Sequence, residues 1–173
     1  CVELPFEPRR YLYHGWQSWS LAAWLDISQP PPLQKPAILH PMQLDPVHAR
    51  DERPNGSWLG AVEVPEGGIL FLGALGLDAH VELDGRRLRG RYEAGGGEWF
   101  VGAWDETTVM ARYADMLEKR FGKGRAETPR RVWCSWYSLY TAIDENILHK
   151  VLSDLGDLPF DVFQVDDGWQ RAI

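Results

Sequence analysis

Two adjacent carboxylates at the end of an apolar segment are the part of this sequence best suited to chemistry. Residues 160–165 carry the Phe and Val side chains typical of a buried strand, and Asp166, Asp167, Gly168 and Trp169 follow them directly. Carboxylates at the carboxyl end of a buried parallel strand are where α/β folds place their active sites. Aspartates accept hydrogen bonds from vicinal hydroxyls, and an indole ring packs on the C–H face of a sugar. The pattern indicates a carbohydrate ligand.

The adjacency of Asp166 and Asp167 favours binding over acid–base catalysis. The two catalytic carboxyl groups of a retaining glycosidase flank the scissile bond about 5–5.5 Å apart. Successive strand residues point to opposite faces, so neighbouring carboxylates converge on one ligand only where the strand ends. Gly168 permits that break, and we expect the pair to clamp neighbouring hydroxyls jointly. The alternative is a solvated turn in which an aspartate caps a helix.

A second aromatic cluster lies in the preceding predicted strand, 131–137. In an extended segment Trp133 and Ser135 face one side, and Cys134 and Trp136 face the other. We interpret Trp133 as a core residue. Trp136 stands where this strand ends, so we expect it at the same mouth as the two aspartates.

A helical crossover is expected between these two strands. Asp144 is suited to cap a helix whose apolar residues between 147 and 155 share one face, and Gly156 is suited to end it. Strand, helix and strand in this order predict parallel neighbours with a right-handed connection. Because one such unit cannot cover both faces of a parallel sheet, we expect residues 131–173 to begin a larger α/β fold.

The first hundred residues have a different character. Their prolines predict an irregular segment over 1–57, without central strands. Strands are expected over 58–64, 68–73, 79–83, 86–92 and 98–104. The Asp84-Gly85 pair is a strong hairpin signal. We therefore expect an antiparallel β domain over 1–104.

A helix is predicted to connect the two domains. Apolar residues recur at helical spacing over 106–121, Asp105 is suited to cap that helix, and Gly122 is suited to end it. We treat 105–130 as the linking helix and linker, and 131–173 as the start of the second domain. The expected fold class is multi-domain, β followed by α/β.

Composition and charge exclude several partners. The chain has 173 residues, a net charge of −7 and a pI near 5.2, which argues against nucleic acid and anionic membranes. No segment approaches the roughly 20 apolar residues of a membrane span. No signal peptide is visible, so we expect a cytoplasmic protein, although a chain starting with Cys1 suggests that its true start is missing.

Metal and nucleophile chemistry are not favoured. The sequence has five histidines, but no two of them have the spacing of metal ligands on a helix. Ser135 and Ser138 lack a nucleophile-elbow pattern, and Cys1 and Cys134 do not make a disulfide framework. We expect neither a metal nor a cofactor.

A tryptophan pair lies in the proline-rich first part of the chain, within the segment Trp16-Gln-Ser-Trp19. Two tryptophans three residues apart fit a corner of a β core, and spacing alone favours that interpretation. A loop that reaches across and covers the ligand site is the alternative.

Three of these motifs together resemble a known family. Trp-Cys-Ser-Trp-Tyr at 133–137, followed by Phe-Asp-Val-Phe-Gln-Val-Asp-Asp-Gly-Trp at 160–169, closely resembles glycoside hydrolase family 36, the α-galactosidases. Trp-Gln-Ser-Trp at 16–19 is similar to a motif in the N-terminal β domain of that family. The resemblance implies the latter part of a β-supersandwich, the linking helix, and the first β-α-β of a (β/α)8 TIM barrel.

The resemblance also implies roles for four residues. Asp166 and Asp167 match the aspartates that bind galactose hydroxyls, and Trp136 matches an aromatic wall of the galactose pocket. Trp19 matches the tryptophan that the β domain contributes, which reverses the interpretation from spacing alone. The family is retaining, and its nucleophile and acid/base are aspartates on later barrel strands. None of the residues here is assigned to either catalytic role.

The expected function is therefore part of a retaining α-galactosidase that acts on α-galactosides, in a segment too short to act alone. A galactosyl transferase similar to raffinose synthase is one alternative, and a non-catalytic galactose-binding or scaffold fragment is another. A homo-oligomer is compatible with the sequence. The preferred linkage, and galactose against N-acetylgalactosamine, stay open.

Overall fold

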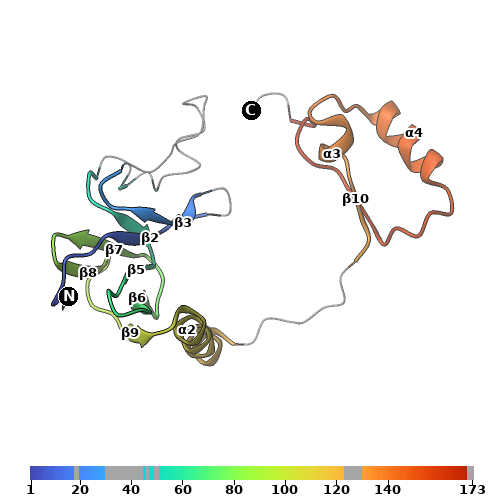
Figure 1. Ribbon diagram of the computed structural model, residues 1–173. Helices are drawn as coiled ribbons and strands as arrows, with labels where there is room; N and C mark the ends of the chain where they lie inside the picture. The colour runs from blue at the N-terminus through green and yellow to red at the C-terminus, as the bar shows by residue number, and fades with distance from the viewer. Residues whose placement is uncertain (18–19, 30–44, 46, 49–50, 123–129, 171–173) are drawn as a thin grey trace. The chain divides into compact units, whose positions relative to one another are not determined.

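The computed structural model describes residues 1–173 except 18–19, 30–44, 46, 49–50, 123–129 and 171–173. The chain forms two compact units, residues 1–124 and residues 125–173 (Figure 1). Each is described by itself. We call them the sheet unit and the strand-end unit.

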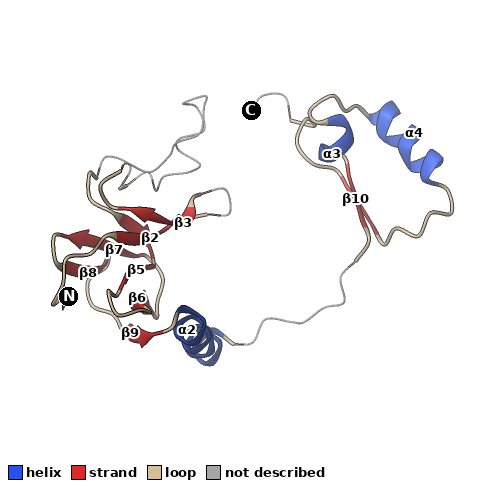
Figure 2. Ribbon diagram, in the orientation of Figure 1, coloured by secondary structure: helices blue, strands red, loops and turns tan. Residues whose placement is uncertain are grey.

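A curled nine-stranded sheet makes up most of the sheet unit (Figure 2). Its strands are β1 (Val2–Glu3), β2 (Arg10–His14), β3 (Ala22–Asp26), β4 (Asn55–Ser57), β5 (Leu59–Glu63), β6 (Ile69–Ala74), β7 (Ala79–Asp84), β8 (Arg87–Tyr92) and β9 (Trp99–Trp104). They follow the order β1-β8-β7-β4-β2-β5-β6-β9, with β3 paired to β2. All described pairs are antiparallel except β2 with β4, which is parallel.

The central strands of the sheet are buried on both faces. Tyr11 and Tyr13 of β2 belong to one apolar cluster together with Val81 of β7, while Leu12 between them belongs to a second cluster together with Phe71 of β6. Alternate side chains of a strand point to opposite faces, so each face needs its own cover. The first cluster also includes residues of β7 and β8.

Helix α2 (Glu106–Phe121) packs on the second cluster and covers that face of the sheet. Asp105 caps it by accepting from the Thr108 N–H, and the Gly122 N–H closes its end on the Glu118 carbonyl. Tyr113 is buried among the apolar residues and donates its hydroxyl to the Ala74 carbonyl at 2.6 Å. That burial raises the pKa of Tyr113 to about 12, so the phenol stays protonated and keeps its donor.

The irregular segment expected over 1–57 is wrong in part, because β1 to β4 all lie within it. β2 is a central strand with three consecutive buried residues, Tyr11, Leu12 and Tyr13. The prolines nearest to it, Pro5 and Pro8, precede the strand and cost it no ladder hydrogen bond. Residues 30–44 lie outside the described part.

The strands expected between 58 and 104 are confirmed within one or two residues as β5 to β9. The predicted hairpin is confirmed as well, since β7 and β8 pair antiparallel from Asp84↔Arg87 onward and Gly85 has a φ of 58°. These strands join a single curled sheet in the described residues.

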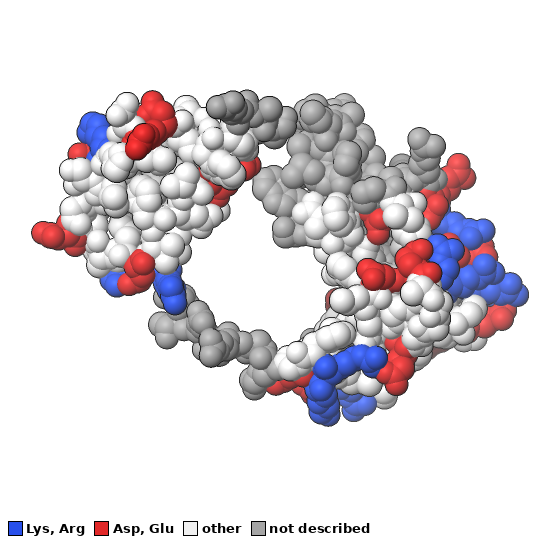
Figure 3. All heavy atoms as spheres, turned by 180° about the vertical axis from the view of Figure 1, so that it is seen from behind, with Lys and Arg blue, Asp and Glu red and all other residues white. Residues whose placement is uncertain are grey.

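Charged side chains of both signs are interspersed over the sheet unit (Figure 3). Neighbouring strands account for some of the pairs. Arg89 Nη2 on β8 lies 2.7 Å from Asp84 Oδ2 on β7, and Arg53 Nη1 lies 3.3 Å from Glu82 Oε1. Exposed pairs of this kind contribute little stability each.

The strand-end unit holds two parallel strands and two helices. Its elements are β10 (Val132–Cys134), α3 (Trp136–Leu139), α4 (Glu145–Leu155) and β11 (Val162–Gln164). Asp144 caps α4 by accepting from the Ile147 N–H, and Gly156 follows the helix, as predicted. β10 and β11 pair in parallel, which confirms the predicted arrangement. The strand expected over 131–137 is too long, because it ends at Cys134.

None of the described helices of either unit is long and apolar enough to cross a membrane.

We predict that Phe71→Ala lowers the free energy of unfolding of the sheet unit by about 3–5 kcal/mol, because it empties a fully buried site between Phe100 and Tyr113. Phe121→Ala is the matched control. Its ring is 57% exposed at the end of α2, so its loss should stay within about 0.5 kcal/mol. Urea unfolding followed by circular dichroism measures both, and equal losses would contradict the assignment of the core.

Candidate binding site at the strand ends

The carboxyl ends of β10 and β11 are fastened together by Ser135. In the parallel register Cys134 lies opposite Gln164, and the Ser135 N–H donates to the Gln164 carbonyl at 3.1 Å. The hydroxyl of Ser135 accepts from the Asp166 N–H at 2.9 Å, and this serine is fully buried. Ser135 therefore holds the backbone of Asp166 at the point where β11 has ended.

Three donors orient the carboxylate of Asp166. Oδ1 accepts from the Asp167 N–H at 2.9 Å, while Oδ2 accepts from Gln164 Nε2 at 3.1 Å and from Cys134 Sγ at 3.3 Å. The backbone hydrogen bond from Asp167, followed by the thiol of Cys134, lowers the pKa of Asp166 below its ordinary value. This carboxylate is therefore ionised near neutral pH and fixed in direction.

Asp167 is the more open of the two aspartates. It is exposed, and its Oδ1 accepts from Gln170 Nε2 at a long 3.4 Å. An ionised carboxylate offers about four lone-pair sites. The described contacts thus leave most of the acceptor capacity of Asp167 for a ligand, whereas Asp166 keeps about one site.

Gly168 lets the chain turn away after the aspartates. Its φ is 112°, a region that residues with a side chain rarely adopt. A Cβ added at this position would stand 2.7 Å from the Cα and carbonyl oxygen of Thr141, which are backbone atoms that cannot move aside. The strand ends at Gln164, before the two aspartates, so the predicted break is confirmed.

Aromatic rings gather near the end of β10. Trp136 is half-buried at the start of α3, and its ring meets that of Tyr140 edge to face at a centroid distance of 5.4 Å. Tyr137, Tyr140 and Trp169 are 83%, 62% and 73% exposed, which leaves their faces open. Trp133 instead stacks on Phe163 of the neighbouring strand at 4.4 Å.

The structure brings three of the four predicted site residues to one edge. Trp136 and Asp166 each stand two residues beyond the paired positions at the ends of β10 and β11, and Asp167 is next in the chain. Trp19 lies outside the described residues, so its role stays a prediction. The sequence interpretation missed the contacts of Ser135 and Cys134. A hydroxyl and a thiol directly before the predicted strand exit were the available signal.

A hollow of about 410 Å³ opens beside this edge. Its lining includes Leu148 and Leu152 of α4, Phe163 of β11, and Gly168 and Trp169 just past the aspartates. Most of the lining is apolar, which suits packing or an aromatic-faced ligand better than an ion.

Comparison with known proteins shows what this chain is similar to. No family model and no curated protein matches the sequence. Among solved structures, the α-galactosidase TtGalA from Thermus thermophilus in complex with stachyose matches 98% of this chain at 44% identity with a TM-score of 0.84. The same enzyme in complex with p-nitrophenyl α-D-galactopyranoside matches with the same identity and score.

This chain is similar to an α-galactosidase over 98% of its length. The resemblance read from the sequence motifs is thereby confirmed. The chain spans about a third of that enzyme, since it covers 36% and 35% of the two matched chains. The activity of the whole α-galactosidase is therefore carried over only as a proposal.

We predict that Ser135→Ala lowers the free energy of unfolding of the strand-end unit by about 1–3 kcal/mol, because the Asp166 N–H loses its acceptor in a partly buried position. Ser138→Ala, at an exposed position of α3, is the control and should change it by less than about 0.5 kcal/mol. Hydrogen exchange of the Asp166 amide provides the local readout. An amide protected equally in both variants would show that Ser135 does not hold it.

Proposed function

We propose that this chain is part of a retaining α-galactosidase, a glycoside hydrolase that releases terminal α-galactosyl residues. The observation that carries the proposal is 44% identity over 98% of the chain to an α-galactosidase with stachyose bound. The substrate class follows from the α-galactosides in the two matched complexes.

The strand-end unit would supply half of the galactose pocket. Asp167 has unused acceptor sites, and Asp166 is ionised and held in one direction, so the pair suits neighbouring hydroxyls of one sugar ring. Trp136 would form a wall of the pocket beside them. Trp19 would come from the β domain, an assignment that rests on the family resemblance alone.

We further propose that the strand-end unit begins a TIM barrel. Two parallel strands with a crossover helix are its repeating element, and such sheets are buried on both faces. Here the apolar residues Leu152, Phe160 and Val165 are each more than 40% exposed, and α4 has no buried residue. Further strands and helices would cover these surfaces. The division at 104 and 130 and the sandwich form of the β domain stay predictions.

Hydrolysis would proceed through a covalent galactosyl-enzyme. One carboxylate attacks the anomeric carbon while another protonates the leaving oxygen, and the second then deprotonates the attacking water. We assign neither role to Asp166 or Asp167. Their part is to hold the sugar in register with those groups, which contributes through binding that persists into the transition state.

In the protein that carries the complete active site, Asp167→Ala should reduce kcat/KM for p-nitrophenyl α-galactoside by about 10²-fold or more, because hydroxyls bound to a charged acceptor lose it. Asp166→Ala should raise KM and lower kcat, since it also frees the Asp167 N–H. Asp157→Ala, an exposed aspartate just after α4, is the control and should leave both constants unchanged.

Wild-type kinetics in both aspartate variants would contradict the assignment of the pocket. Galactose binding without turnover in the unaltered protein would favour the non-catalytic alternative. Transfer of galactose to an added sugar in preference to water would favour the transferase, and product analysis by chromatography separates it from hydrolysis.

A further inference from the structure

A second cluster of chemically capable side chains lies in the sheet unit, away from the strand ends. Asp45, His48 and His80 each offer one ligand atom, and these three atoms lie within 4.8 Å of one another. His80 belongs to β7, whereas Asp45 and His48 precede β4 by several residues. A hollow of about 320 Å³ is lined by these three residues together with Trp16, Trp58 and Glu93.

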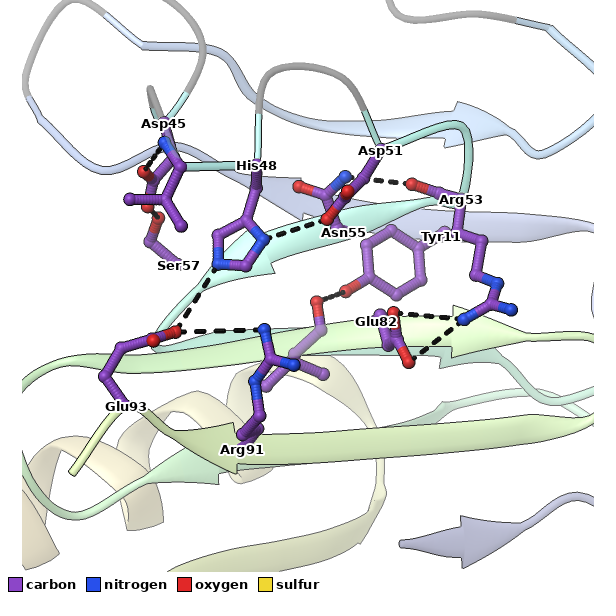
Figure 4. Close-up of polar contacts among 12 residues, drawn as sticks. Tyr11, Asp45, His48, Asp51, Arg53, Asn55, Ser57, Glu82, Arg91 and Glu93 are labelled. Atoms are coloured by element: carbon purple, nitrogen blue, oxygen red, sulfur yellow. Dashed lines mark hydrogen bonds and ion pairs between the residues drawn. The ribbon is translucent and has the colours of Figure 1, made fainter. Parts of the chain in front are cut away.

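The sheet holds Asp45 close to His80. Ser57 of β4 pairs directly opposite His80 of β7 in the antiparallel register. The Ser57 hydroxyl donates to Asp45 Oδ2 at 3.3 Å, and the Val47 N–H donates to Oδ1 at 3.0 Å (Figure 4). The carboxylate is thus tied at both oxygens, and each still has a lone pair free for a cation.

His48 is oriented as a metal ligand would be. Its Nδ1 lies 2.8 Å from Asp51 Oδ2, which fixes that nitrogen as the donor and leaves the lone pair on Nε2 (Figure 4). A carboxylate behind a histidine is the usual outer contact of a metal-ligating imidazole. Nε2 lies 3.7 Å from Glu93 Oε1, so a further carboxylate faces the same space.

His80 is buried without a partner. It is 5% exposed, and neither of its ring nitrogens has a hydrogen-bond partner among the described residues. Its ring stacks on that of His48 with centroids 3.3 Å apart and planes at 13°. Buried polar atoms normally have a partner, so the two nitrogens of His80 indicate that a ligand or ion binds beside this ring.

The charge around the hollow favours a cation. Asp45, Asp51 and Glu93 are acidic, while Arg91, whose Nη2 is 3.9 Å from Glu93, is the basic group that the described ion pairs place beside them. Two imidazoles with carboxylate oxygens are the donors that zinc and its neighbours in the first transition row prefer. Calcium and magnesium, which take oxygen donors, fit less well.

We propose that Asp45, His48 and His80 form a binding site for a divalent transition-metal ion such as Zn²⁺. Bond lengths of about 2.0–2.2 Å require the two stacked imidazoles to rotate out of their parallel stack, so that one nitrogen of each points at the ion. Asp51 is the outer contact that orients His48. With one ligand on β7 and two on the segment before β4, the ion fastens that segment to the sheet and acts structurally.

The site is tested by titrating Zn²⁺ into untagged protein stripped with a chelator and then freed of it. Calorimetry should give one ion per chain. Co²⁺ in place of zinc should give the visible absorption bands of a low-symmetry site with nitrogen and oxygen donors. Asp45→Asn, a substitution of equal size, should abolish both signals while circular dichroism stays unchanged. His80→Ala should abolish them too, and Asp51→Asn should weaken the affinity about 10–100-fold.

His149→Ala is the matched control, because His149 is an exposed histidine on α4 in the other unit, paired only with Glu145 in the described contacts. It should leave the affinity unchanged. Zinc should raise the Tm of the wild type and of this control but not that of Asp45→Asn. The proposal is overturned if the wild type binds no zinc at millimolar concentration, or if folded Asp45→Asn and His80→Ala bind it as the wild type does.

Discussion

The hydrogen bond from the Asp166 N–H to the buried hydroxyl of Ser135 is the contact on which the binding edge depends. It ties the first residue beyond β10 to the second residue beyond β11, so the two segments leave the sheet together. Without such a tie, a strand end is free to fray, and a carboxylate carried on it has no fixed direction. The backbone hydrogen bonds at the strand ends therefore determine where the carboxylates lie.

In the sheet unit, the main constraint is the burial of apolar side chains on both faces of the sheet. The central strands carry apolar side chains on both faces, and each face packs in its own cluster, the second of which includes residues of α2. Buried polar groups in this core are tied to backbone carbonyls, as Tyr11 is to Val81 and Tyr113 to Ala74. His80 departs from that rule, which is why its environment is informative.

Features that depend on residues close together in the sequence were predicted correctly, whereas features that depend on residues far apart were missed. The caps Asp105 and Asp144 and the Asp84-Gly85 turn depend on residues within four positions, and all three were predicted. β2 was missed because both of its faces are buried, so it lacks the alternation of polar and apolar residues that marks a half-buried strand. The histidine and aspartate cluster was missed because β7 lies more than thirty residues beyond Asp45 and His48, and only strand pairing joins them.

Asp166 and Asp167 are neighbours in the sequence, but they differ in how many hydrogen bonds they accept from the protein. The carboxylate of Asp166 accepts hydrogen bonds from Asp167, Gln164 and Cys134. The bond from the Asp167 N–H also positions the backbone of Asp167. Asp167 is left exposed with its acceptor sites largely free. Asp166 therefore contributes more to the local hydrogen bonding of the turn than Asp167 does. Asp166 is partly exposed and Asp167 is exposed, so the two differ in how many acceptor sites the described contacts leave free.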